Sequence, residues 1–248
     1  MQDRKQQLIV ALDVPSFEEA RQLIDKLKED VDIFKVGSQL FTACGPVVVR
    51  YIAAMGKKVF LDLKYHDIPN TVASAVERAV ALNQQTHTVN NELYDPKEHG
   101  IFMLTVHILG GKEMLKAAKE AALKQSKELG VLNPKIVGIT VLTSDASTTN
   151  VLDIVLERAR LAKESGLDGI VASSQEAAIL RQEFGKDFII VTPGIRPLGE
   201  KSQDQKRVTT PSEAIKNGSS FLVIGRPIVC ATNPLNAAKE ILKEMNNI

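Results

Sequence analysis

Short apolar runs alternate with amphipathic segments from one end of the chain to the other. The runs are almost continuously hydrophobic, which is typical of strands covered on both faces in a parallel sheet. We expect eight such strands, at residues 8–14, 33–37, 58–64, 101–107, 135–143, 169–174, 188–194 and 221–228.

Helical patterns follow each strand. Thr210 and Glu213 have the spacing of a capping box, with Pro211 at the first helical position. Gly218 is expected just beyond the end of that helix, where the backbone often becomes left-handed. The predicted helices are 17–29, 39–55, 71–82, 112–129, 151–165, 175–184, 212–217 and 235–245.

Eight β/α repeats in 248 residues predict an α/β protein, a single (β/α)8 TIM barrel, as one domain over residues 1–248. A doubly wound open sheet is the main alternative. The least regular stretch is polar and predicts an excursion at 84–100, before the fourth strand.

Composition narrows the functional classes. The chain has 31 Lys and Arg against 30 Asp and Glu, so no global field favours nucleic acid or an anionic membrane surface. No apolar stretch approaches the roughly 20 residues that span a bilayer, and no signal peptide is predicted. Cys44 and Cys230 lack the spacing of a metal site, so we expect reduced thiols in a cytoplasmic protein.

Polar side chains end most of the predicted strands. In a barrel, active sites lie at the carboxyl ends of the strands, so we expect these side chains to face one mouth. They are Asp13, Lys35, Asp62, Lys64, Thr143, Arg196 and Arg226.

Asp62, Lys64 and Asp67 follow an apolar run at spacings of 2 and 3. Regular alternation along a strand would place Asp62 and Lys64 on the same face, a carboxylate beside an ammonium. The residues alone leave open whether this is a structural ion pair or a reactive one.

The loops after the seventh and eighth strands are the usual phosphate site of a barrel. Arg196 follows the seventh strand, and Gly225 with Arg226 follows the eighth. Gln205, in the polar loop between them, could close over a ligand. Turn glycines, solvated arginines and a surface glutamine are the alternative.

None of the four histidines lies in a metal-binding pattern, and no nucleophile elbow occurs. We expect His107 to be a hydrogen-bonded structural residue. The charged sequence from Asp62 to Asp67 is explained without His66.

Six short sequences taken together are characteristic of one family. They are the D-x-K-x-x-D core from Asp62 to Asp67, its I-P-N-T continuation to Thr71, A-L-D ending at Asp13, F-K-V-G containing Lys35, and the T-P-G-I-R-P and I-G-R-P loops of Arg196 and Arg226. With them, the chain resembles orotidine 5'-phosphate decarboxylases over residues 8–227. The D-x-K-x-x-D core alone is shared with a wider suprafamily of phosphosugar lyases.

The resemblance implies a (β/α)8 barrel that acts as a homodimer without metal or organic cofactor. It implies a carboxy-lyase that converts orotidine 5'-phosphate to UMP and carbon dioxide in de novo pyrimidine biosynthesis. The excursion at 84–100 is longer than the connection usual in this family.

Each matched residue also receives an implied role. Lys64 is expected to protonate C6 of the pyrimidine, flanked by Lys35 and Asp62. Asp67 and Thr71 are expected to reach the site of the neighbouring subunit. Asp13 and Lys35 are expected to bind the ribose hydroxyls, and Thr143 is expected to bind the pyrimidine edge. The residues expected on the phosphate side are Arg196, Gln205, Gly225 and Arg226.

We expect Asp62 mainly to position Lys64, with repulsion of the substrate carboxylate as the alternative. Two other functions stay open. A lyase of the same suprafamily would hold Mg²⁺ among similar carboxylates to act on a keto-sugar phosphate. A non-catalytic barrel would only bind a phosphorylated metabolite.

Overall fold

The computed structural model describes residues 4–84, 95–141, 150–197 and 209–247. Within them, eight parallel strands pair in chain order, and β8 pairs with β1 to close a barrel. The predicted (β/α)8 barrel is therefore confirmed, and the open sheet is excluded. The strands are β1 (Leu8–Ala11), β2 (Ile33–Gly37), β3 (Lys58–Tyr65), β4 (Gly100–His107), β5 (Lys135–Ile139), β6 (Gly169–Val171), β7 (Ile189–Thr192) and β8 (Phe221–Ile224).

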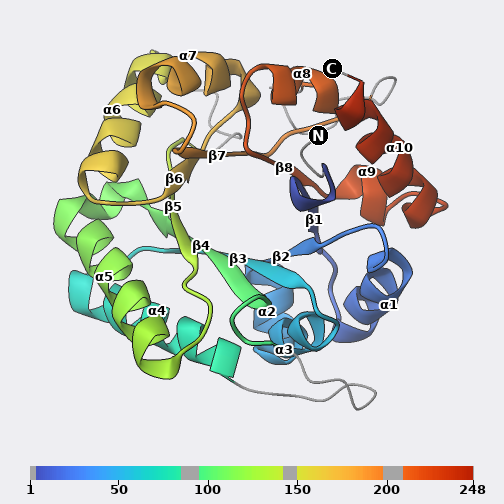
Figure 1. The fold of residues 1–248 in the computed structure, drawn as a ribbon, viewed down its shortest axis with the longest axis horizontal. Coiled ribbons are helices and arrows are strands. Elements are labelled where there is room, and N and C mark those ends of the chain that lie inside the picture. The colour runs from blue at the N-terminus through green and yellow to red at the C-terminus, as the bar shows by residue number, and fades with distance from the viewer. Residues whose placement is uncertain (1–3, 85–94, 142–149, 198–208, 248) are drawn as a thin grey trace.

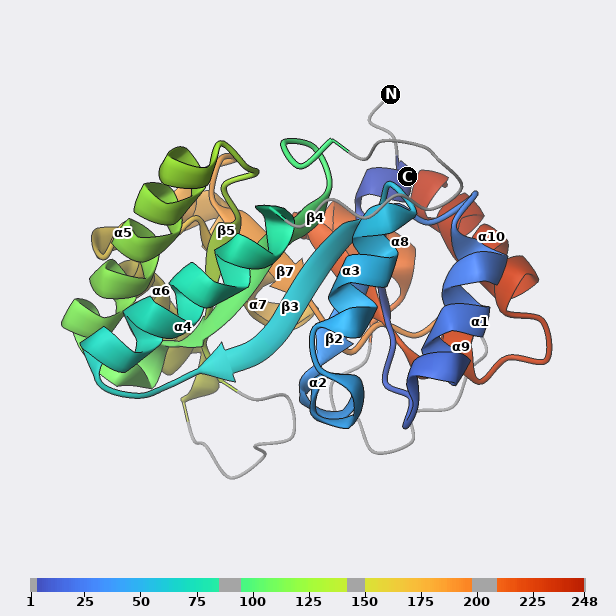
Figure 2. The ribbon, with the colours of Figure 1, turned by 90° about the horizontal axis from the view of Figure 1, so that it is seen from below.

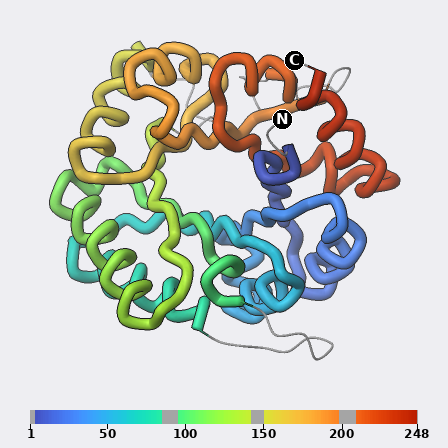
Figure 3. Tube along the Cα trace, viewed as in Figure 1, coloured from blue at the N-terminus to red at the C-terminus, as the bar shows by residue number. Residues whose placement is uncertain are grey.

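Helices surround the strands as an outer ring (Figure 1), and the Cα trace shows the same closed ring (Figure 3). They are α1 (Phe17–Leu27), α2 (Ser38–Cys44), α3 (Val47–Ala54), α4 (Pro69–Ala81), α5 (Gly111–Leu129), α6 (Val151–Glu164), α7 (Ser174–Phe184), α8 (Pro211–Lys216), α9 (Arg226–Val229) and α10 (Pro234–Asn246). Three short 3-10 helices are η1 (Arg4–Gln6), η2 (Leu82–Gln84) and η3 (Ile108–Gly110). None of the described helices is both long and apolar enough to cross a membrane.

The strands are apolar on both faces because each face packs on a different core. In β1, Leu8 and Val10 pack in the layer between strands and helices, while Ile9 packs inside the barrel. The interior cluster consists of Ile9, Ile33, Phe60, Met103, Val137 and Val191. This cluster fills the barrel, so a ligand can enter only above it, at one end of the strands.

The predicted helix at 39–55 is wrong as a single helix. Gly45 has φ 60° and ψ −150°, a conformation that side chains with a Cβ rarely adopt. Pro46 follows and has no N–H to continue the helical hydrogen bonds. The chain therefore forms α2 and α3, with a turn between them.

The predicted eighth strand at 221–228 is also too long. Pairing ends at Ile224, and Arg226 begins the short helix α9, whose first turn tolerates Pro227. The fifth strand likewise ends at Ile139 and the sixth at Val171. These earlier ends leave more chain to form the rim of the barrel mouth.

The helix ends of α8 match the sequence prediction. The Thr210 hydroxyl accepts from the Glu213 backbone N–H at 3.3 Å, and the Glu213 carboxylate accepts from the Thr210 N–H at 3.2 Å. Gly218, just beyond the helix, has φ 95°. Of the predicted excursion at 84–100, residues 85–94 lie outside the described residues.

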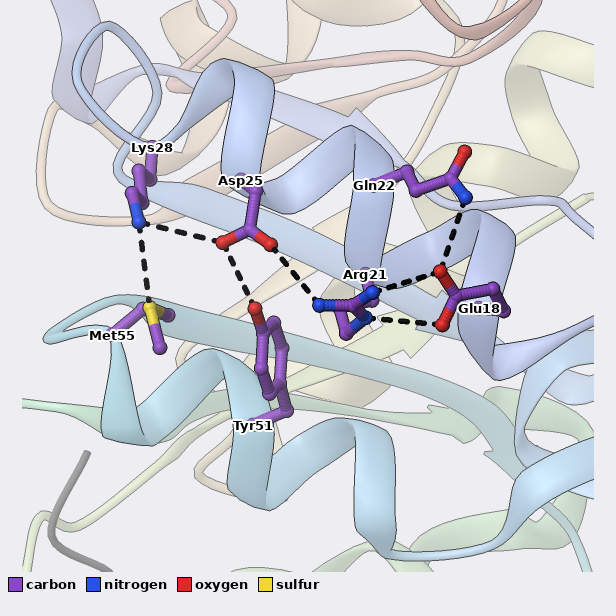
Figure 4. Close-up of polar contacts among 7 residues, drawn as sticks. All are labelled: Glu18, Arg21, Gln22, Asp25, Lys28, Tyr51 and Met55. Carbon is purple, nitrogen blue, oxygen red and sulfur yellow. Dashed lines mark hydrogen bonds and ion pairs between the residues drawn. The ribbon is translucent and has the colours of Figure 1, made fainter. Parts of the chain in front are cut away.

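Helices α1 and α3 are joined by a polar cluster on the outside of the barrel (Figure 4). The Tyr51 hydroxyl donates to Asp25 Oδ1 at 2.8 Å, and Lys28 Nζ lies 3.4 Å from the same oxygen. Arg21 contacts Asp25 from one turn away, at 3.9 Å. Burial and then the bond to Asp25 raise the pKa of Tyr51 to about 12.

We expect Tyr51→Phe to lower the free energy of unfolding by about 1 kcal/mol at pH 7, the usual value of one hydrogen bond. Because the pKa of Tyr51 is raised in the fold from 10.0 to about 12, its contribution is complete below pH 10 and is lost as the pH rises to about 12. Urea unfolding at pH 7 and pH 11 measures both effects. A stability difference between parent and variant that is equal at both pH values would contradict this assignment.

Candidate active site

A cavity of about 340 Å³ opens at the carboxyl ends of the strands. Figure 2 shows the barrel from the side, with the carboxyl end of β3 and helix α2 at the same end. The cavity brings together six of the predicted side chains, which are Asp13, Lys35, Asp62, Lys64, Arg196 and Arg226. Its remaining lining is Ala11, Phe60, Ile139, Val141, Val171, Pro193, Gly194, Val223 and Gly225. Thr143 and Gln205 lie outside the described residues.

Four charged side chains of alternating sign lie side by side just after β1 and on β2 and β3. Lys35 Nζ lies 2.9 Å from Asp13 Oδ1 and 3.6 Å from Asp62 Oδ2. Lys64 Nζ lies 2.8 Å from Asp62 Oδ1 and 2.9 Å from Oδ2. Lys35 and Asp62 are each only 8% exposed, so their pairing offsets a large desolvation cost.

Gly37, at the end of β2, leaves room for this array. A Cβ at this position would lie 3.0 Å from Lys35 Nζ and 3.3 Å from Asp13 Oδ1. Any larger residue would therefore press on the ion pair. Gly37 was not predicted to have a role at the site, although it ends the F-K-V-G sequence.

Lys64 is adjacent to Asp62 as predicted, but regular strand alternation is not the reason. Lys64 has φ 51°, which costs a residue with a Cβ about 1–2 kcal/mol. The pairing of β3 with β4 changes register between Leu61 and Tyr65. The two charged groups thus meet on an irregular segment of β3 that surrounding contacts must hold in place.

Thr105 of β4 supplies two of those contacts. Its hydroxyl accepts from the Lys64 backbone N–H at 2.8 Å and donates to Asp62 Oδ1 at 3.1 Å. The residue is completely buried. Thr105 was not among the predicted site residues, and its only signal in the sequence was a hydroxyl within the apolar run of β4.

A second group of cavity residues comes from the loops after β7 and β8. Arg196 is buried, and its backbone N–H donates to Thr209 O at 3.0 Å. Arg226 begins α9 directly after Gly225. A Cβ on Gly225 would lie 3.3 Å from the Ala11 side chain, so only glycine fits there without displacement. These loops place two guanidinium groups on the wall next to the charged array.

Asp67 and Thr71 do not line this cavity. Both are exposed at the start of α4, and Asp67 Oδ1 accepts from the Ile68 N–H at 2.6 Å. The side chain of Ile68 beside them is 65% exposed, unusually high for a large apolar residue. The start of α4 therefore presents an apolar and acidic surface that is not part of the cavity lining.

His107 lies near the mouth as a structural residue. Its ring stacks on His66 with centroids 5.3 Å apart, and its Nδ1 accepts from the Leu109 N–H at 3.4 Å. Burial lowers the pKa of His107, and the adjacent His66 ring acts in the same direction. The positive charge of Lys64 lowers it further. The hydrogen-bonded role expected for His107 is confirmed.

Within the described ranges, no group of three or more His, Cys, Asp or Glu side chains is placed to hold a metal ion. The carboxylates of the cavity instead contact lysine ammonium groups. An array of this kind can stabilise negative charge and can deliver a proton from an ammonium.

The family model described as "Orotidine 5'-phosphate decarboxylase / HUMPS family" matches residues 6–241. The chain belongs to this family. The charged array and the two arginine loops therefore belong to a barrel of the orotidine 5'-phosphate decarboxylase / HUMPS family.

Relatives of the chain are named orotidine 5'-phosphate decarboxylases. The orotidine 5'-phosphate decarboxylase of Geotalea daltonii is 43% identical, with 98% of this chain and 97% of the relative covered. That of a Nostoc species is 44% identical, with 97% and 98% covered. The crystal structure of orotidine 5'-phosphate decarboxylase from Lactobacillus acidophilus has a TM-score of 0.78 at 36% identity, covering 97% of this chain and 99% of that one.

Proposed function

We propose that the protein is a carboxy-lyase that converts orotidine 5'-phosphate to UMP and carbon dioxide, in the de novo synthesis of pyrimidines. The observation that carries the proposal is the Lys64 ammonium, which contacts Asp62 inside a cavity that also holds two arginines. Relatives named for this activity are more than 40% identical over nearly the whole chain.

Lys64 is the proton donor in this proposal. When the bond between C6 and the carboxylate breaks, carbon dioxide leaves and the electron pair stays on C6. No carbonyl is placed to delocalise that charge, so a fixed positive charge must stabilise it. The Lys64 ammonium supplies the charge, transfers a proton from Nζ to C6, and is then reprotonated from water. Asp62 positions it through contacts at 2.8 and 2.9 Å.

The other cavity residues bind the rest of the nucleotide. Asp13 and Lys35 form an ion pair at the mouth, and we assign the ribose hydroxyls to them. Arg196, Gly225 and Arg226 take the phosphate, because a guanidinium and an approachable backbone suit that anion. Thr143 and Gln205, outside the described residues, keep their proposed contacts with the pyrimidine edge and the phosphate side.

The reaction is expected to need no metal or organic cofactor. Purified protein, treated with a chelator, is incubated with orotidine 5'-phosphate while the ultraviolet absorbance of the pyrimidine is followed. We expect full turnover to UMP after chelation. Turnover of orotidine 5'-phosphate that requires Mg²⁺ would contradict the metal-free reaction. No turnover of it, together with Mg²⁺-dependent activity on a keto-sugar phosphate, would favour a lyase of that class, and tight binding without turnover would favour a non-catalytic barrel.

We further propose that the active form is a homodimer in which Asp67 and Thr71 complete the neighbouring site. Support comes from their exposure at the start of α4 and from the exposed Ile68 between them, since a large apolar side chain is rarely left in water. Asp67 would then add a second carboxylate beside the partner's Lys64.

Mixing two variants tests the dimer. Lys64→Ala and Asp67→Ala chains should each be poorly active alone. Once subunits exchange, half of the dimers are mixed and hold one intact site, so about one quarter of the parent activity is expected to return. No recovery on mixing, with subunit exchange confirmed by mass, would show that Asp67 does not act across an interface.

We further propose that the enzyme is cytoplasmic and acts on a small-molecule substrate, with neither nucleic acid nor membrane as a partner. We also treat residues 1–248 as one domain, which is supported by the pairing of β1 with β8.

A further inference from the structure

Strands β3 and β4 lose their register at the charged site. Leu61 pairs with Leu104, and the next recorded pair is Tyr65 with Val106. Between these pairs β3 advances by four residues and β4 by two. Thr105 is therefore the one residue of β4 that faces the whole segment from Asp62 to Lys64, which forms an enlarged β-bulge.

A bulge leaves backbone groups without their usual partner on the neighbouring strand. The Lys64 N–H is such a group, and the Thr105 hydroxyl accepts from it at 2.8 Å in place of a carbonyl. This bond holds Lys64 at φ 51°, a conformation that a residue with a Cβ does not keep unless its surroundings impose it.

The same hydroxyl also orients the carboxylate. The Thr105 hydroxyl donates a hydrogen bond to Asp62 Oδ1 at 3.1 Å. Lys64 Nζ contacts the same oxygen at 2.8 Å. A hydroxyl has one donor hydrogen, so donation to Asp62 leaves its lone pairs to receive the Lys64 N–H. Thr105 thus contacts the backbone of one charged residue and the side chain of the other while completely buried.

We propose that Thr105 is the positioning residue of the proton donor. Its hydroxyl fixes the bulge and the Asp62 carboxylate together, so that the Lys64 ammonium is held at one place in the cavity. The role rests on the proposed function of Lys64 as proton donor. Thr105 itself does not line the cavity, so we expect it to act through Asp62 and Lys64 and not by direct contact with the substrate.

Thr105→Val removes the hydroxyl and keeps the shape of the side chain. We expect kcat for orotidine 5'-phosphate to fall by about 100-fold, because a small displacement of a reacting group has an effect of that size. KM should change far less, since the arginine loops and the Asp13–Lys35 pair are untouched. Thr105→Ser, which restores the hydroxyl, should recover most of the lost kcat.

Ser219→Ala is the matched control. Ser219 is also buried, and its hydroxyl bonds to the Thr192 hydroxyl at 2.7 Å, between the chain leading to β8 and the end of β7. Its loss should lower the Tm as Thr105→Val does, yet leave kcat unchanged. If Thr105→Val does not fold, Thr105→Cys replaces it. A thiol is a weak hydrogen-bond donor, so kcat of Thr105→Cys should lie between that of the parent and that of a variant without a hydroxyl.

Three results would overturn the proposal. One is a folded Thr105→Val protein, or its Cys replacement, with the parent kcat. Another is an equal loss of kcat in Ser219→Ala, which would mean that general destabilisation is responsible. The last is a Thr105→Ser protein as slow as Thr105→Val. A failure of the parent itself to turn over orotidine 5'-phosphate would be a separate result, against the proposed function.

Discussion

Lys64→Ala is expected to abolish turnover of orotidine 5'-phosphate, even at saturating substrate. The substitution removes both the positive charge that stabilises the carbanion and the proton that C6 receives. General acid catalysis contributes about 10²–10⁴-fold and a preorganised charge about 10²–10³-fold, so kcat should fall by at least about 10⁴-fold. Stopped and continuous absorbance assays over a wide range of enzyme concentration measure a loss of this size.

The fold should survive this change. Asp62 keeps Lys35 at 3.6 Å and the Thr105 hydroxyl at 3.1 Å, so its carboxylate is not left without partners. Lys119→Ala is a matched control, because Lys119 on α5 also pairs with an aspartate, Asp168, but lies outside the cavity. It should keep the parent kcat. A Lys64→Ala enzyme with near-normal kcat would remove Lys64 as proton donor.

Arg226→Ala is expected to lower kcat/KM by at least about 100-fold. A guanidinium can make two parallel hydrogen bonds to a phosphate, each contributing about 1.5 kcal/mol or more, and 1.36 kcal/mol corresponds to tenfold. Initial rates at low substrate give kcat/KM directly. The binding of the distant phosphate contributes to the reaction because it holds the pyrimidine against the charged array.

The nucleoside orotidine, which lacks the phosphate, makes the test specific. If Arg226 acts through the phosphate, parent and Arg226→Ala enzymes should have the same kcat/KM for orotidine. An equal loss with both substrates would show that Arg226 acts on the structure of the mouth instead. Arg160→Ala, which breaks a surface pair with Glu183, should have no effect on either substrate.

The sequence predicted the barrel well because its signals are local and repeated. Each strand is an apolar run covered on both faces, and β2 ends at Gly37 as expected. The prediction of a helix was wrong where the backbone conformation of a single residue interrupts the helical periodicity. The helical periodicity of 39–55 continues across Gly45, but its backbone at φ 60° ends α2 there.

Six of the predicted side chains meet in the cavity, but the geometry that brings them together could not be predicted. Charged residues after apolar strands are visible in any sequence, so Asp62 and Lys64 stand out. The bulge that brings them together depends on β4, which lies about 40 residues further along the chain, and a threonine in a strand is common for reasons of propensity alone. The role of Thr105 therefore required the register of β3 against β4.

A crystal structure of the protein with UMP bound is the most direct test of the proton donor. Lys64 Nζ is expected within about 3.5 Å of C6, still in contact with Asp62, and with the phosphate on the arginine loops. A closed complex in which the Lys64 ammonium points into bulk solvent, with another group next to C6, would contradict the mechanism.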